Sequence, residues 1–307
     1  MNERNHAIDI LKGLGILLVV YGHSGHDRIP AMVFDYIYSF HMPLFFLVTG
    51  LLSWGRMDVP FGEYAAKKVK SLLIPYICFF AIALLAYEAK AKFAYMPDMT
   101  WLRAFLFGGR YCADIPLVWP LWFLHTLFFA TLIFWFIARM NKIAILAVFI
   151  ATFPLYVQVG GTGSLPNIVQ ALTFICFGYL IGDRQERISG KFTCWIFIAL
   201  GMLIVVKFNY LVKMNYPMMV AAAIISVRGW YGLCRFVGRN RVMEYLGRNS
   251  LYILGLHGIM WMGANIAARL TGAPPMIAAV IAAAVNALLC CAVCEVYRRV
   301  KYRLVKR

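Results

Sequence analysis

The sequence predicts an all-α fold: a polytopic membrane helix bundle with about 10 transmembrane helices and both termini cytoplasmic. Of the 307 residues, 63% are hydrophobic and only 14% are charged, and the mean hydropathy is +0.74. A soluble domain of this length needs more polar surface, so the excess apolar surface is expected to face lipid. The apolar runs approach the roughly 20 residues with which a helix crosses a bilayer core.

The apolar runs give the predicted spans in chain order. They cover roughly residues 8–24, 37–54, 71–89, 118–138, 143–158, 165–182, 192–208, 214–232, 247–268 and 274–297. No linker, low-complexity tract or clear internal repeat divides them, so we expect a single domain over residues 1–307. The first run follows a charged start without an A-x-A-like cleavage site, which predicts a retained helix instead of a signal peptide.

The distribution of basic residues supports this arrangement of spans. Of the 30 Lys and Arg, 22 fall in the segments predicted to be cytoplasmic and 8 in the outer segments. This bias follows the positive-inside rule and favours an even number of spans. The basic residues that give the net charge of +17 lie in short loops between apolar runs. These loops lack the interleaved aromatic residues of a nucleic-acid-binding surface. Membrane lipids and phosphates are therefore the expected partners, and nucleic acid is not.

The cysteines predict neither an outer disulfide nor a metal site. Of eight cysteines, only Cys112 lies in an outer segment, so no disulfide is expected there within one chain. Cys290, Cys291 and Cys294 cluster in the last span. A metal would need further ligands, and none is evident in the sequence, so we interpret the three as small packing residues.

Ionisable residues inside a membrane span are candidates for function, because burying them in lipid is costly. The first span carries Asp9, Lys12 and His23. Lys12 precedes His23 by eleven positions, which is about three helical turns, so both lie on one face roughly 16.5 Å apart. The structural alternative is that Asp9 and Lys12 only mark the start of the helix, with Lys12 reaching the interface, and that His23 is a packed histidine.

The other histidines concentrate toward the outer half of the predicted bundle. His41 opens the second span, His125 lies in the outer part of the fourth, and His257 lies near the middle of the ninth. Imidazole titrates near neutrality and is the commonest general base. With the basic residues on the inner side, this asymmetry predicts an anionic ligand held from inside and proton transfer nearer the outside.

Lys67, Lys68 and Lys70 lead directly into the third span. They could form a phosphate clamp, or they could serve topology alone. Trp122 lies near a span end, where tryptophan commonly belongs to the interfacial belt.

Five segments together resemble one family. They are DILKGLGILLVVYGH (Asp9–His23), FHMPLFF (Phe40–Phe46) followed by Thr49-Gly50, KSLLIPY (Lys70–Tyr76), LWFL (Leu121–Leu124) and GRNSLYILGLH (Gly247–His257). In order and character they resemble the acyltransferase 3 family of integral membrane O-acyltransferases, and within it the branch named after fucose 4-O-acetylases. The resemblance spans nearly the whole chain, and its most specific element is a basic residue and a histidine with ten residues between them.

The resemblance implies transfer of an acyl group, usually acetyl, from coenzyme A to a hydroxyl of a cell-surface sugar or glycan precursor. Acetyl-CoA would be the co-substrate, no metal would be needed, and the protein would lie in a bacterial inner membrane. Lys12 and His23 match the signature, while Lys67 and Lys70 stand where the family has two arginines three residues apart. Trp122, Asn249, His257 and Asp9 lie in matching segments and are expected to have structural or substrate-positioning roles.

These inferences combine into one hypothesis. Lys67, Lys70 and Lys12 bind the phosphates of acyl-CoA, His23 acts as general base on the acceptor hydroxyl, and His41 orients the acceptor or stabilises the oxyanion. A carboxylate of Asp27, Asp35 or Asp114 could orient His23, and a covalent acyl-histidine is an open alternative. A secondary transporter or proton-coupled exporter would use similar intramembrane residues. The oligomeric state, the acceptor and the acyl group stay open.

Overall fold

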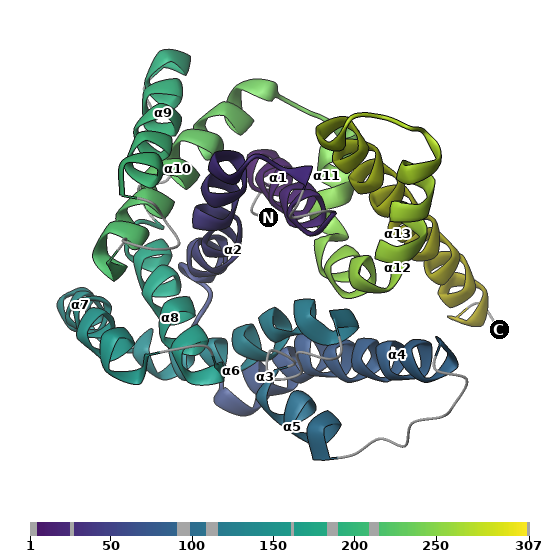
Figure 1. Ribbon diagram of the computed structural model, residues 1–307. Coiled ribbons are helices and arrows are strands. Elements are labelled where there is room, and N and C mark those ends of the chain that lie inside the picture. The colour runs from purple at the N-terminus through teal and green to yellow at the C-terminus, as the bar shows by residue number, and fades with distance from the viewer. Residues whose placement is uncertain are drawn as a thin grey trace. The chain divides into compact units, whose positions relative to one another are not determined.

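The computed structural model describes residues 5–24, 28–90, 99–108, 116–160, 163–182, 190–208 and 215–305. Over these ranges the regular structure is helical and contains no strand (Figure 1). Eight of the helices found there are long and apolar enough to cross a membrane, or nine if the bent α12 counts as one span. The 17-residue α8 is a shorter apolar helix. The predicted class, an all-α polytopic membrane bundle, is confirmed.

Each predicted span coincides with a helix, but several boundaries differ. The second and third spans begin earlier than predicted, at Ala31 and at Phe61. Two short helices were not predicted: α5 (Met99–Phe107) and α11 (Arg241–Arg248). Both contain charged residues that a search for apolar runs of full membrane length passes over.

The helices fall into two compact units that interleave along the chain. The first comprises residues 1–42, 190–214 and 222–307, and the second comprises residues 43–189 and 215–221. Two helices, α2 (Ala31–Ser53) and α10 (Tyr216–Val237), contribute residues to both. The single domain expected from the sequence stays a prediction, since units defined by contacts need not fold independently.

The first unit is built around α1 (His6–His23). This helix packs along α11 and also contacts α12 (Ser250–Leu270) and α13 (Pro275–Val305), which pack against each other (Figure 1). Asn5 caps the start of α1, where its side chain accepts a hydrogen bond of 3.2 Å from the backbone N–H of Ile8. The unit also contains α9 (Lys191–Phe208).

The second unit contains a long helical run followed by three packed helices. The run consists of α3 (Phe61–Lys68), the π-helical turn η2 (Val69–Leu73) and α4 (Ile74–Lys90). After α5 and the 3-10 helix η3 (Pro116–Leu121) come α6 (Trp122–Ile137), α7 (Lys142–Val159) and α8 (Ser164–Leu180). Here α8 packs against both α6 and α7.

The π-helical turn has a local cause in the sequence. Pro75 lacks the amide hydrogen that would bond to the carbonyl of Ser71, four residues earlier. The backbone widens just before it, and the N–H of Ile74 bonds to the carbonyl of Val69, five residues earlier. Single π turns of this kind often occur near functional sites. This one contains Lys70, a predicted phosphate-binding residue.

A pair of glycines brings two helix backbones into contact in each unit. In the first, a Cβ on Gly247 of α11 would collide with the carbonyl of Asp9, and one on Gly13 would collide with that of Met243. In the second unit, a Cβ on Gly50 of α2 would collide with the backbone carbonyl of Ile175 in α8. A Cβ on Gly178 of α8 would collide with the backbone carbonyl of Leu47. Small residues that allow close backbone approach are typical of helix packing in membranes.

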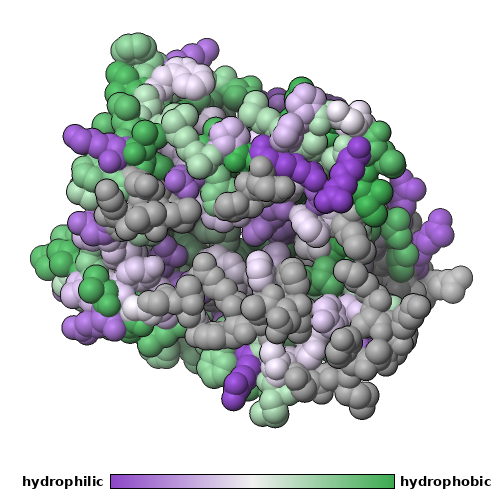
Figure 2. Space-filling model, viewed as in Figure 1, coloured by the Kyte–Doolittle hydropathy of each residue, from purple (hydrophilic) through white to green (hydrophobic). Residues whose placement is uncertain are grey.

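Large apolar side chains are exposed on several helices, and many surface residues in the view of Figure 2 are hydrophobic. Leu270 of α12 is 84% exposed, Ile143 of α7 80%, and Phe192 of α9 78%. Such exposure is unfavourable in water and is expected where a helix faces lipid.

Candidate functional site

Three histidines and a tyrosine gather in the first unit. The ring centre of His23, the last residue of α1, lies 5.3 Å from that of His257 in α12 and 6.1 Å from that of Tyr38 in α2. Tyr38 in turn lies 4.8 Å from the ring of His41. His41 and His257 are buried, whereas His23 is half-buried. The structure therefore brings together three of the predicted site residues, His23, His41 and His257.

His41 does not open its helix, as the sequence suggested, but lies inside α2, because that helix begins at Ala31. The early start was missed because Asp35 interrupts the apolar run. Lying within the helix allows the Nδ1 of His41 to contact the carbonyl of Ile37, one turn earlier, at 2.7 Å.

Two of the histidines have a defined tautomer. A carbonyl oxygen only accepts, so the Nδ1–H of His41 donates to Ile37 and that of His257 donates to the carbonyl of Leu254 at 2.8 Å. In both neutral rings Nε2 is left with a lone pair that can accept a hydrogen bond. The ring next to His23, that of His257, thus presents a hydrogen-bond acceptor.

Tyr38 and Gly22 fix one side of the cluster. The ring of Tyr38 stacks on Phe34 with centres 4.0 Å apart, and its hydroxyl donates to the carbonyl of Gly22 at 3.5 Å. A Cβ on Gly22 would lie 2.9 Å from Tyr38 Cε2, so glycine leaves room for this ring beside His23.

The other end of α1 carries Asp9 and Lys12. Asp9 is 6% exposed and Lys12 is half-buried, so neither extends freely into solvent. Both have polar or electrostatic partners. The backbone carbonyl of Asp9 lies where α1 crosses α11 at Gly247. With 1.5 Å per residue, Lys12 lies roughly 16.5 Å along the helix from His23.

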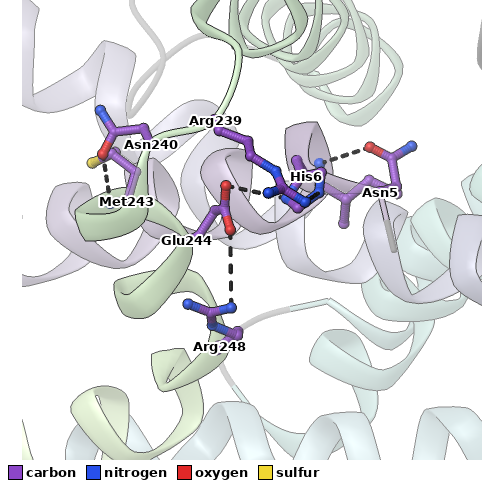
Figure 3. A network of polar contacts seen from close by, with 8 residues as sticks. Asn5, His6, Arg239, Asn240, Met243, Glu244 and Arg248 are labelled. Atoms are coloured by element: carbon purple, nitrogen blue, oxygen red, sulfur yellow. Dashed lines mark hydrogen bonds and ion pairs between the residues drawn. The ribbon is translucent and has the colours of Figure 1, made fainter. Parts of the chain in front are cut away.

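A polar network joins the start of α1 to α11 (Figure 3). The Nδ1 of His6 lies 3.1 Å from a carboxylate oxygen of Glu244, and a guanidinium nitrogen of Arg239 lies 3.3 Å from His6 Nε2. Because arginine only donates, the contact with Arg239 makes Nε2 an acceptor and leaves the ring hydrogen of neutral His6 on Nδ1, the nitrogen nearer Glu244. Arg248 approaches the second carboxylate oxygen at 3.9 Å. The network holds the first turn of α1 against α11, and His23 lies at the opposite end of α1.

Lys67 and Lys70 belong to the second unit, one near the end of α3 and one in η2. Both are exposed, and they are three residues apart on consecutive helical turns. Lys68 is half-buried, and its ammonium lies over the ring of Tyr64 at 5.1 Å. The two exposed ammonium groups are thus available to an anion, and that of Lys68 is engaged within the fold.

The remaining predicted residues have local structural partners. Asn249 joins α11 to α12, and its side chain donates to the carbonyl of Tyr245 at 2.8 Å. Trp122 begins α6 and packs edge-on against Phe46, with ring centres 6.4 Å apart. His125, in the second unit, donates from Nε2 to the carbonyl of Leu106 at 3.0 Å. Of the carboxylates considered for orienting His23, Asp27 and Asp114 lie outside the described residues, while Asp35 is half-buried in α2.

Sequence reasoning did not single out Tyr38 or Asn286. The side chain of Asn286 in α13 is 1% exposed and donates to the backbone carbonyl of His257 at 3.0 Å. It is an uncharged polar residue in an otherwise apolar run, a weaker signal than a charge but one that could have marked it. Tyr38 gave no signal of its own, because tyrosine is common near span ends.

Comparison with known proteins gives the chain a family. The acyltransferase domain matches residues 5–296. The chain is similar to the nodulation protein NolL of Sinorhizobium fredii, with 27% identity over 225 residues, which covers 66% of the chain and 58% of the relative. Its identity to NolL of Mesorhizobium japonicum is 24% over 216 residues, covering 65% and 54%. The chain thus spans little more than half the length of these relatives, and no solved structure matches it.

Proposed function

Because the chain belongs to the acyltransferase 3 family, we propose that it is an O-acyltransferase that transfers an acetyl group from acetyl-CoA to a sugar hydroxyl. The acceptor would be a cell-surface glycan or its precursor. The protein would lie in a bacterial inner membrane with both termini in the cytoplasm, where acetyl-CoA is available. The observation that carries the proposal is the His23, His41 and His257 cluster at the end of α1.

His23 acts as the general base in this reaction. The acceptor oxygen attacks the thioester carbonyl while its proton passes to a ring nitrogen of His23. The C–S bond then breaks, and the CoA thiolate leaves and recovers a proton, so that the products are an O-acetyl ester and free CoA. Base catalysis by a positioned histidine typically accelerates such steps about 10²–10⁴-fold.

His41 assists at the acceptor. Its Nδ1–H is occupied by the carbonyl of Ile37, so its Nε2 is suited to accept a hydrogen bond from a second hydroxyl of the sugar. Donation to the developing oxyanion would require a proton on Nε2 as well. The tautomer therefore favours the orienting role over the oxyanion role.

Lys67 and Lys70 bind the phosphates of CoA, and Lys12 is assigned the same role from the family signature. Support for the first two comes from their exposure and their spacing along one helix. Lysine acts on phosphate as a point charge without the two-pronged geometry of arginine. Lys68 is left out, because its ammonium lies over Tyr64.

Replacing both lysines should weaken donor binding with little effect on chemistry. In Lys67→Ala/Lys70→Ala we expect the KM for acetyl-CoA to rise about 10–100-fold, since a hydrogen bond to a charged group contributes about 1.5–3 kcal/mol. The value of kcat should change less, because phosphates distant from the reacting carbonyl are held equally in ground and transition states.

The matched control is Lys67→Arg/Lys70→Arg, which keeps both charges and should retain a KM near that of the wild type. Steady-state thiol release against acetyl-CoA concentration measures all three proteins. An unchanged KM in the double alanine variant would remove the two lysines from donor binding.

Release of free CoA thiol by purified protein in detergent tests the function itself. With acetyl-CoA and a mixture of candidate sugars, we expect thiol release that depends on the sugars, and stabilisation of the protein by CoA against heat. A secondary transporter would show neither. Absence of both effects would therefore reject the proposed function.

A further inference from the structure

Building on the proposed function, we infer that His257 is the positioning residue for His23: its Nε2 accepts the hydrogen bond from the imidazolium that His23 becomes as the acceptor hydroxyl attacks. The sequence pointed to a carboxylate in this role. Among the described residues, the imidazole of His257 lies beside His23, with ring centres 5.3 Å apart and planes inclined by 44°.

The separation suits a hydrogen bond between the two rings. A ring nitrogen lies about 1.15 Å from its ring centre, so a bond of about 2.9 Å between two such nitrogens places the centres about 5.2 Å apart. The rings are therefore at the distance at which rotation of the His23 ring about its Cβ–Cγ bond can bring a donor to the acceptor, while the His257 ring keeps its bond to Leu254.

The chemistry of His257 makes it the acceptor of the pair. Its Nδ1–H is used by the carbonyl of Leu254 at 2.8 Å, which leaves the lone pair on Nε2. The residue is 1% exposed, and within the part of the chain that the structure describes Nε2 has no hydrogen-bond partner. A buried acceptor without a donor is unfavourable. The N–H that neutral His23 carries on the ring nitrogen nearer His257 would satisfy it, and this hydrogen bond becomes stronger when the other ring nitrogen takes up the hydroxyl proton.

The backbone around His257 is held from a neighbouring helix. Asn286 of α13 donates to the carbonyl of His257 at 3.0 Å, and its own oxygen accepts a contact from Cys290 Sγ at 3.4 Å. Asn286 and Cys290 are buried. An acceptor fixed at both its ring and its main chain needs little reorganisation when a cation forms beside it, which is what electrostatic preorganisation requires.

The other titratable groups near His23 suit this role less well. Tyr38 on α2 lies 6.1 Å away edge-on, and its hydroxyl is directed to the carbonyl of Gly22. His41 on α2 has its ring contact with Tyr38. A neutral histidine also supplies an acceptor without placing a permanent negative charge in an apolar interior, where an ionised carboxylate would be costly.

During transfer no proton needs to reach His257. The hydroxyl proton moves to one ring nitrogen of His23, and the hydrogen on the other ring nitrogen donates to His257 Nε2. When the thiolate leaves, His23 returns its proton to sulfur or to solvent and the pair is restored. His257 thus acts through His23 and never on the acyl group.

The test compares two substitutions of His257. Leucine fills similar space without an acceptor, whereas the side-chain oxygen of glutamine reaches close to the position of Nε2. We expect His257→Leu to lower the kcat of thiol release about 10–100-fold and to leave the KM for acetyl-CoA within about twofold. His257→Gln should recover most of the lost kcat. If His257 had a purely structural role, kcat in the two variants would not depend on whether the new side chain can accept a hydrogen bond.

Two further measurements keep the inference falsifiable if His257→Leu folds poorly. Asn286→Ala leaves the imidazole in place and loosens its backbone, and kcat should fall by roughly three- to tenfold with an unchanged KM. In a His23→Ala background, the leucine and glutamine substitutions should have equal effects, since His257 acts only through His23.

The outcomes separate this inference from the proposed function. An active wild type with full kcat in His257→Leu overturns the inference alone, as does an equal loss of kcat in the leucine and glutamine variants. A wild type that neither releases thiol nor is stabilised by CoA overturns the proposed function together with the inference.

Discussion

Replacing His23 by alanine should lower the kcat of acetyl transfer by about 10²–10⁴-fold, the usual contribution of a positioned general base. The alanine has no group to take the proton of the acceptor hydroxyl, so the attacking oxygen must lose it to water. Each tenfold loss corresponds to about 1.4 kcal/mol of transition-state stabilisation. The KM for acetyl-CoA should change little, because the phosphates are assigned to lysines elsewhere.

The measurement is thiol release by wild type, His23→Ala and a matched histidine variant. His125→Gln serves as the match, since His125 lies in the second unit and its Nε2 only donates to the carbonyl of Leu106, which glutamine can also do. That variant should retain wild-type kcat. Equal thiol release from His23→Ala and wild type would exclude His23 as the base and direct attention to His41.

The second large effect concerns stability and arises at Gly247. In Gly247→Ala the new methyl would occupy the position of the Asp9 carbonyl oxygen, so α11 and α1 must separate. Overpacking usually costs about 1–3 kcal/mol. The upper part of that range is expected, because the obstacle is backbone and cannot turn aside. Tm should fall by roughly 5 °C or more, measured in detergent at a fixed heating rate because unfolding of membrane proteins is often irreversible.

Gly62→Ala is the control for the intrinsic effect of alanine in a helix. Gly62 lies in α3, where an added Cβ would meet nothing within 4 Å, and alanine has the higher helix propensity by up to about 1 kcal/mol. Its Tm should stay the same or rise. A Gly247→Ala protein as stable as the wild type would show that the helices do not cross this closely.

The apolar runs predicted the membrane helices because lipid demands a long, nearly uncharged segment for each one. The same criterion failed at boundaries where a helix contains a charge. Asp35 concealed the first turns of α2, and the charges of Arg241 and Glu244 concealed α11, which crosses α1 without being a span. The division into two interleaved units could not be predicted from the apolar runs either, because it depends on contacts between segments far apart in the chain.

At the candidate site, the sequence predicted His23, His41 and His257 individually, because each is an ionisable group in an apolar run. Their gathering into one cluster with Tyr38 depends on how α1, α2 and α12 pack and could not be derived from spacing within one helix. The roles of Asn286 and of the tautomers depend on hydrogen bonds to backbone carbonyls, which follow from the fold alone.

The paired glycines also bear on how far this sequence can drift. Where a side chain blocks a larger residue, a second substitution elsewhere can restore room. At Gly247 and Gly178 the obstacle is a main-chain carbonyl, which no substitution removes. A second substitution therefore cannot compensate for a larger residue at these positions. The choice of residue there is restricted by the space between the two backbones and not by the chemistry of the side chain. A descendant that loses His23, the proposed base, should keep these glycines for as long as it keeps its fold.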